Sequence, residues 1–193
     1  LLKQLEESGF GVDIGGYNLS TLAYADDIVL MANTPAKLQS LVDICYNWCN
    51  VWGMKANVLK CGSLSFSAPD CQMTWGNSTI SHGEPYKYLG VTFDPQLSWD
   101  LHIKKIKNTA ISRLNKYKPF FQNYFINMLL KSKVYEESIR SQMEYAGYMS
   151  WGLSSLADTL TTVQNKALHY MTLTSNSCWR EGLENELGIG DLK

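Results

Sequence analysis

The stretch Leu22–Ala32 constrains this sequence most, because two adjacent carboxylates, Asp26 and Asp27, separate two apolar runs in it. The run from Ile28 to Ala32 begins with β-branched residues, and its unbroken apolar character predicts a strand buried on both faces. The run from Leu19 to Tyr24 predicts the antiparallel partner of that strand. We therefore expect the two aspartates at or near the tip of a tight hairpin.

Two carboxylates at a hairpin tip admit two interpretations. Aspartate is a good turn former, so the pair could serve the backbone alone. Neighbouring anions also repel each other and lose solvation, so they attract a counter-charge, and hard carboxylate oxygens open to solvent suit Mg²⁺. The remainder of the chain has to distinguish a structural turn from a metal site.

Charge is distributed unevenly along the chain. The net charge is −1, which by itself argues against a protein that binds polyanions. Residues 101–140, however, contain nine Lys or Arg and two Glu, a net charge of +7, whereas the rest of the chain carries −8. This asymmetry indicates that the basic segment binds nucleic acid, although a solvated helix face is the alternative interpretation.

The first half of the chain reads as short strands around one amphipathic helix. Thr34 and Pro35 are typical of a helix start, and Gly53 is typical of a helix end. Between them, apolar residues recur at helical spacing: Leu38, Leu41, Val42, Cys45, Trp48, Cys49 and Trp52. A later strand is predicted from Tyr86 to Phe93, with Asp94 and Pro95 ending it.

The second half reads as helices. Ser98 is the expected cap of the first helix, whose apolar face consists of Trp99, Ile103, Ile106, Ala110, Leu114 and Tyr117. Its exposed cations are expected to be Lys104, Lys105, Lys107 and Arg113. Further helical patterns run from Phe125 to Ala146 and from Leu160 to Met171. Strands followed by helices predict an α+β fold, divided near Pro95.

The order of these motifs resembles the reverse transcriptases of non-LTR (LINE-type) retrotransposons. The resemblance rests on Tyr24-Ala25-Asp26-Asp27, the amphipathic helix, the Gly-x-x-x-Asn…Lys pattern at Gly53, Asn57 and Lys60, the Tyr-x-Tyr-Leu-Gly-Val strand at 86–91, and the basic helices. It covers most of the chain. It implies a partial polymerase palm (an antiparallel sheet with a packed helix) over residues 1–95, a helical thumb over 96–150 and a helical extension over 151–193.

The resemblance also implies roles for individual residues. Asp26 matches the metal-binding carboxylate of the hairpin and Asp27 its neighbour, and Lys60 matches a lysine that protonates the leaving pyrophosphate. Five further residues match positions beside the primer or nucleotide: Tyr24, Ala25, Tyr88, Leu89 and Gly90. The implied cofactor is Mg²⁺, with Mn²⁺ as a substitute, bound weakly by this chain. The implied partners are an RNA template, a DNA primer and dNTPs.

One part of the family's site has no counterpart in the sequence. A further metal-binding carboxylate sits on a strand before the nucleotide-pocket helix, and we expect that strand and the fingers upstream of Leu1. The chain is therefore expected to be a fragment that does not polymerise without the missing N-terminal half. A non-catalytic remnant that binds nucleic acid is the alternative, and a purely structural α+β domain is a third interpretation.

The sequence shows no pattern typical of secreted or membrane proteins. Its five cysteines are odd in number and scattered, so they predict no disulfide framework. No apolar run approaches the length of a transmembrane helix, and no signal peptide opens the sequence. We expect an intracellular protein, nuclear or cytoplasmic, without a membrane partner.

Overall fold

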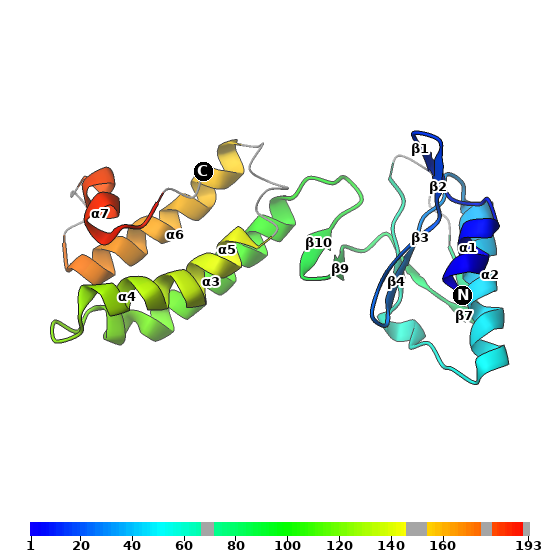
Figure 1. Ribbon diagram of the computed structural model, residues 1–193, viewed down its shortest axis with the longest axis horizontal. Coiled ribbons are helices and arrows are strands. Elements are labelled where there is room, and N and C mark those ends of the chain that lie inside the picture. The colour runs from blue at the N-terminus through cyan, green and yellow to red at the C-terminus, as the bar shows by residue number, and fades with distance from the viewer. Residues whose placement is uncertain (67–71, 146–153, 175–178, 191–193) are drawn as a thin grey trace. The chain divides into compact units, whose positions relative to one another are not determined.

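The computed structural model describes residues 1–66, 72–145, 154–174 and 179–190 (Figure 1). The chain divides into two compact units. Unit 1 comprises residues 1–86 and 94–97, and unit 2 comprises residues 87–93 and 98–193. Most strands belong to unit 1 and most helices to unit 2, so the α+β class is confirmed.

Unit 1 is built around α2 (Pro35–Trp52), which begins and ends where the sequence predicts. The Thr34 hydroxyl accepts a hydrogen bond from the Lys37 N–H at 3.3 Å, and Gly53 ends the helix in the left-handed region, with φ +65°. The short helix α1 (Leu2–Glu7) packs against α2 through its buried Leu5. The buried face of α2 consists of Leu41, Val42 and Cys45.

The strands of unit 1 are short and pair two by two. They are β1 (Val12–Ile14), β2 (Tyr17–Leu19), β3 (Thr21–Tyr24), β4 (Asp27–Leu30), β5 (Gly62–Ser63), β6 (Thr74–Trp75), β7 (Ser78–Thr79) and β8 (Ser81–His82). The pairs β1–β2, β3–β4 and β6–β7 are antiparallel, whereas β5–β8 is parallel. The antiparallel sheet expected from the sequence is therefore divided, among the described residues, into separate two-stranded ladders.

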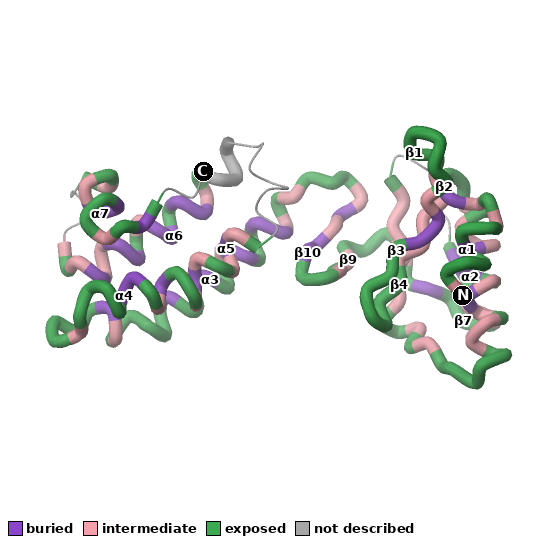
Figure 2. The backbone as a smooth tube through the Cα atoms, in the orientation of Figure 1, coloured by how far each residue is buried: buried purple, intermediate pink, exposed green. Residues whose placement is uncertain are grey.

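The prediction that β4 is buried on both faces is wrong. Ile28 is 40% exposed, and Leu22 on the partner strand is 48% exposed. Only the end of β4 reaches the core, where Leu30 packs against the clusters around α1 and α2. Figure 2 shows the other end of the β3–β4 hairpin as exposed backbone. The reason is that the described helices of unit 1 cover one end of the hairpin and leave its tip in solvent.

Unit 2 begins with a hairpin where the sequence predicts one strand. Strand β9 (Tyr86–Tyr88) pairs with β10 (Val91–Phe93). Leu89 and Gly90 form the turn between them, with φ +45° and +87°. Two successive residues with positive φ are what a two-residue hairpin turn requires, so the chain reverses here instead of continuing as a strand.

The helices of unit 2 are α3 (Asp100–Phe121), α4 (Met128–Tyr135), the π-helical segment η2 (Glu136–Arg140), α5 (Ser141–Glu144), α6 (Ser154–Thr172) and α7 (Arg180–Leu187). The predicted Ser98 cap is wrong, because α3 begins after Trp99, which has φ +63° and no capping hydrogen bond from its side chain. The predicted start at Phe125 is also wrong. The Asn127 side chain caps α4 instead.

A single large core holds unit 2 together. Four of the six residues predicted to form the apolar face of α3 are buried in it, namely Ile103, Ile106, Ala110 and Leu114. Trp99 is half-buried and Tyr117 is 37% exposed, so the predicted face is too long at both ends. The other large buried residues include Phe121, Tyr135, Ile139, Met143, Leu168 and Met171.

Several polar groups inside this core are hydrogen-bonded. The Tyr135 hydroxyl donates to the Gln164 side-chain oxygen at 3.0 Å, and the Gln164 amide donates to Glu184 at 2.7 Å. The ammonium of Lys131, which is 2% exposed, donates to the Met171 carbonyl at 3.1 Å. Burial lowers the pKa of Lys131. Within the described residues, no helix is both long enough and apolar enough to span a bilayer.

Candidate active site and nucleic-acid interface

The acidic pair lies at the tip of the β3–β4 hairpin, as the sequence predicts. The strands pair in the register Thr21 to Leu30 and Tyr24 to Asp27, which leaves Ala25 and Asp26 as a two-residue loop. Ala25 has φ +53°. Directly opposed residues of an antiparallel pair share a face of the ladder, so the Asp27 carboxylate and the Tyr24 ring lie side by side.

The two carboxylates of the tip are open to solvent. Asp26 and Asp27 are both exposed, and among the described residues neither forms an ion pair. The described residues contain no group of three or more His, Cys, Asp or Glu side chains that could hold a metal ion. The oxygens of this pair fit a hard divalent cation in chemical type, but they supply only two of the carboxylates that a tight site uses.

Lys60 is positioned through its backbone. It ends a short 3₁₀ helix, η1 (Val58–Lys60), and its carbonyl accepts a hydrogen bond from the Tyr86 hydroxyl at 2.6 Å. The Tyr86 ring also packs on Gly62, where a Cβ atom would come within 2.5 Å of that ring. Any larger residue at position 62 would therefore displace Tyr86.

The charge of the acidic hairpin also affects the pKa of Tyr86. Burial raises the pKa of its hydroxyl, and nearby Cys61 and Asp27 raise this pKa further. The structure thus joins the Lys60 segment to a phenol whose pKa is also raised by the charge of Asp27, and sequence reasoning did not assign this phenol to the site. The contact of Tyr86 with this segment joins residues that are far apart in the sequence. Gly62 and Tyr86, for example, are 24 positions apart, and no local pattern connects them.

The β9–β10 turn is held by a second tyrosine, within unit 2. The Tyr145 hydroxyl donates to the Leu89 carbonyl at 2.7 Å. A Cβ atom on Gly90 would lie 2.8 Å from the Tyr145 ring, so this glycine is required by contact as well as by φ. Tyr88 is half-buried, whereas Leu89 and Gly90 are exposed at the turn.

Strand β10 is fixed to the start of α3. The Thr92 N–H donates to Nδ1 of the buried His102 at 3.2 Å, and the Lys105 ammonium approaches the Thr92 hydroxyl at 3.5 Å. Burial lowers the pKa of His102, and the positive charges of Lys105 and Lys87 lower it further. The hairpin that carries Tyr88, Leu89 and Gly90 therefore moves with α3.

The predicted cationic face of α3 is mostly in solvent. Lys104, Lys105 and Arg113 are exposed, whereas Lys107 is half-buried. The Arg113 guanidinium donates to the Ser138 carbonyl at 2.8 Å, so part of its hydrogen-bonding capacity is used within unit 2. Sequence reasoning placed three of these four cations correctly in water and overestimated the exposure of Lys107.

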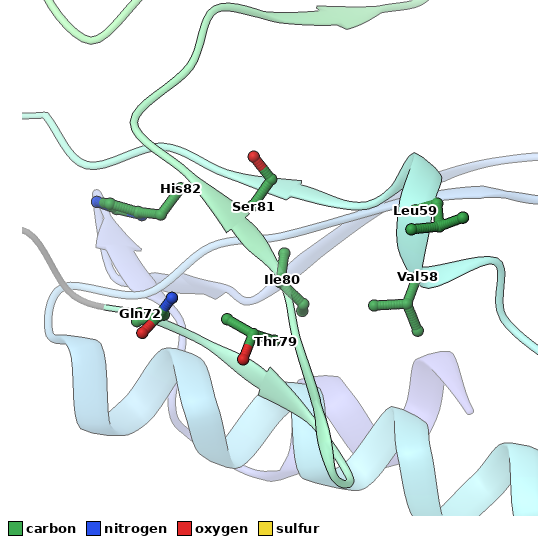
Figure 3. A pocket seen from close by; sticks show the side chains of 7 residues that line it. All are labelled: Val58, Leu59, Gln72, Thr79, Ile80, Ser81 and His82. Carbon is green, nitrogen blue, oxygen red and sulfur yellow. The ribbon is translucent and has the colours of Figure 1, made fainter.

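Unit 1 also contains a pocket of about 600 Å³ (Figure 3). It is lined by Val58, Leu59, Gln72, Thr79, Ile80, Ser81 and His82. The acidic residues of the hairpin tip are not among them. The lining contains no carboxylate or ammonium group, so this pocket does not supply the charges that the candidate active site requires.

Comparison with known proteins bears on the first half of the chain. Residues 1–93 match the family described as reverse transcriptase (RNA-dependent DNA polymerase). This part of the chain is therefore similar to reverse transcriptases. The matched range contains the acidic hairpin, Lys60, Tyr86 and the β9–β10 turn, so each of these features lies within the part of the chain that is similar to reverse transcriptases.

Three curated reverse transcriptases of mobile elements resemble the chain. The RNA-directed DNA polymerase from mobile element jockey of Drosophila funebris is 31% identical over 102 residues, which cover 48% of this chain and 11% of that protein. Its Drosophila melanogaster counterpart is 28% identical over 106 residues, with the same coverage. The probable RNA-directed DNA polymerase from transposon BS of Drosophila melanogaster is 26% identical over 164 residues, 77% of this chain and 18% of that protein.

These matches confirm the predicted resemblance to LINE-type reverse transcriptases. The chain spans between 11% and 18% of the length of these curated relatives. No solved structure matches this chain significantly.

Proposed function

We propose that the chain forms part of an RNA-directed DNA polymerase. Residues 1–95 form part of the palm, residues 96–150 the thumb and residues 151–193 a helical extension. The acidic hairpin carries the proposal, because an exposed Asp pair at a tight β-turn lies within the residues that match the reverse transcriptase family. An RNA template, a DNA primer and dNTPs are the substrates of the complete enzyme.

Asp26 and Asp27 are the residues that would hold Mg²⁺ or Mn²⁺ through their carboxylate oxygens. In nucleotidyl transfer, two such ions activate the attacking 3′-oxygen and stabilise the leaving oxygen. Tyr24 and Ala25 lie beside the pair and border the primer end, as Tyr88, Leu89 and Gly90 do in the β9–β10 hairpin. The exposed turn residues support this role because an extended strand of nucleic acid can reach them.

Lys60 is proposed to donate a proton to the leaving pyrophosphate, or to neutralise its charge. Support for this role comes from the hydrogen bond between the Lys60 carbonyl and the Tyr86 hydroxyl, which fixes the backbone at Lys60. The side chain of Lys60 is exposed and is therefore accessible to a nucleotide.

Metal binding by the chain alone should be weak, because two carboxylates replace few of the waters that Mg²⁺ holds. We expect dissociation constants of about 1 mM or more, measured by Mg²⁺ titration of amide resonances. The Asp26→Asn variant should lose this binding, whereas Glu84→Gln, which removes an exposed charge elsewhere in unit 1, should retain it. Equal titrations for wild type and Asp26→Asn would contradict the assignment.

Catalysis by the chain alone is not expected, because two carboxylates cannot hold two ions in reactive geometry. The measurement is primer extension on an RNA template with Mg²⁺ or Mn²⁺. Incorporation of dNTPs that disappears in Asp26→Asn would show that the site is complete in this chain.

A second candidate function is nucleic-acid binding without catalysis. The observation in its favour is that residues 101–135 contain eight Lys or Arg and no acid. A cationic surface binds phosphates by releasing counterions, so affinity falls steeply as the salt concentration rises. Phosphate contacts position a duplex without reading its sequence, so little sequence preference is expected.

The test of this face is hybrid binding by fluorescence anisotropy across a salt series. Changing Lys104, Lys105 and Lys107 together to Gln should weaken binding to an RNA–DNA hybrid and reduce the salt slope by about one unit per lost contact. The matched control replaces three exposed lysines of unit 1, Lys3, Lys37 and Lys55, with Gln. Stability should change by less than about 0.5 kcal/mol in either variant. Equal slopes for the α3 variant and the wild type would show that the α3 lysines are only a solvated surface.

A further inference from the structure

The turn between α3 and α4 presents two aromatic rings to solvent. Tyr124 is 83% exposed and Phe125 is 95% exposed. The ring centroids are 6.1 Å apart and the rings are nearly perpendicular, at 79°. Large aromatic side chains usually bury most of their surface, so two adjacent rings with almost none buried require an explanation.

This turn has a defined hydrogen-bonded conformation. The Asn123 side chain accepts a hydrogen bond from the Phe125 N–H at 2.9 Å, and the Asn123 carbonyl accepts one from the Ile126 N–H at 3.3 Å. The Asn127 side chain caps α4 by accepting from the Leu129 N–H at 2.8 Å. The backbone is therefore ordered before any ligand binds, which lowers the entropic cost of binding through the two rings.

The charged residues that flank the turn in the sequence are all positive. Lys116 and Lys118 lie on the last turns of α3, Lys133 lies on α4, and all three are exposed. The Lys118 ammonium lies 5.3 Å from the centre of the Tyr170 ring. No Asp or Glu occurs in the sequence between Asp100 and Glu136. A polyanion is therefore favoured at this end of unit 2.

We propose that Tyr124 and Phe125 form a stacking site for the bases of a single-stranded nucleic acid. The flanking lysines bind its phosphates while the rings bind its bases. Base stacking on aromatic rings tolerates any sequence, because every base has a π-face. The neighbouring Leu129 and Leu130 are 67% and 50% exposed and would also suit an apolar protein surface, but such a surface does not account for the three exposed lysines that flank the rings in the sequence.

This inference rests on the proposed nucleic-acid binding of unit 2 and adds a second, base-directed contact to it. Stacking releases no counterions, so it contributes to affinity without changing the salt slope. The phosphate-binding face of α3 and the stacking site at the turn are consequently separable by experiment.

The probes are a fluorescein-labelled oligouridylate and an abasic oligonucleotide of the same length, which has phosphates but no bases. The double variant Tyr124→Ala/Phe125→Ala should bind the oligouridylate about tenfold more weakly than wild type does. It should bind the abasic oligonucleotide as wild type does, with the same salt slope. The control is Tyr17→Ala, which removes an 81% exposed ring from the first residue of β2 in unit 1.

Three outcomes overturn the inference. The first is equal binding of the oligouridylate by wild type and the double variant. If the salt slope is steep in that case, the proposal that the α3 lysines bind phosphates is still supported. The second is no binding of either oligonucleotide, which removes the proposed nucleic-acid function as well. The third is a wild-type dimer that the double variant abolishes in sedimentation, because the rings then bind a second copy. Retention of oligouridylate affinity by Phe125→Trp supports stacking as the mechanism.

Discussion

The two units differ in how much of their apolar surface they bury. Unit 2 has one connected core that joins α3 to α7, whereas unit 1 has two small clusters around α1 and α2. Both units leave large apolar side chains exposed, such as Leu22 and Trp52 in unit 1 and Tyr124 and Phe125 in unit 2, so the difference lies in the buried clusters. The candidate catalytic residues therefore lie in the unit with less hydrophobic stabilisation, and we expect unit 1 to unfold before unit 2.

The largest effect should come from deleting one buried leucine in each unit. Leu41 of α2 and Leu114 of α3 are both 0% exposed, and truncation to alanine typically costs about 2–5 kcal/mol. Because a small domain is often stable by only about 5 kcal/mol, Leu41→Ala should abolish the folding of unit 1. Leu114→Ala should lower the melting temperature of unit 2 while its transition stays cooperative.

Calorimetry and amide spectra of the two variants provide the measurement. Each variant should change the signals of its own unit only. If Leu41→Ala and Leu114→Ala both melt the whole chain in one transition, the two units fold as one and the comparison fails.

The next effect concerns one glutamine in each unit. Gln164 is 0% exposed and bridges Tyr135 to Glu184. Gln164→Leu removes the acceptor of the buried Tyr135 hydroxyl, while Glu184 keeps its ion pair with Arg180, so the change should cost about 1–3 kcal/mol. Gln39 exchanges two hydrogen bonds of 2.9 Å with the backbone of Thr74 near the surface of unit 1. The matched variant Gln39→Leu should cost about 0.5–1.5 kcal/mol.

Denaturant titrations of the two glutamine variants test this order. A larger loss for Gln39→Leu than for Gln164→Leu would show that the attachment of β6 to α2 limits stability more than the polar network of unit 2 does.

The smallest effect is a pH dependence confined to unit 2. The pKa of His102 is lower in the folded chain than the unfolded value of 6.5, so the unfolded chain binds its proton at higher pH. The stabilisation of the folded state that comes from neutral His102 is complete above pH 6.5, and it is lost as the pH falls through the pKa of His102 in the folded chain. In His102→Asn, the side-chain oxygen can accept the Thr92 N–H without titrating. Melting temperatures of this variant should fall less between pH 7 and pH 5 than those of wild type, and parallel curves would refute this role of His102.

Local signals explain which elements were predictable from the sequence. The Thr34 cap, Gly53 and the acidic turn each depend on neighbouring residues, and all three were located correctly. The prediction of one strand from Tyr86 to Phe93 was wrong because Leu89 adopts positive φ, which residues with a side chain disfavour. The Leu89 carbonyl accepts a hydrogen bond from Tyr145 in this turn, and no local sequence pattern indicates that contact.

The candidate site was predictable only in part, for the same reason. The positions of Asp26 and Asp27 follow from the hairpin pattern. The contacts of Lys60 with Tyr86 and of Gly90 with Tyr145 join segments distant in sequence, and no periodicity or motif encodes them. The burial of β4 was overestimated because its apolar run gives no information about which described elements cover it.

Ala25 destabilises the acidic turn, because it adopts a backbone conformation that alanine disfavours. An L-residue other than Gly, Asn or Asp in the left-handed region costs roughly 1–2 kcal/mol, and Ala25 adopts φ +53° between two paired strands. Selection for thermal stability alone would therefore replace Ala25 with glycine. Strained residues of this kind are often found at functional sites, where function opposes the relief of strain. Melting temperatures of wild type and Ala25→Gly would measure the stability that alanine at this position costs.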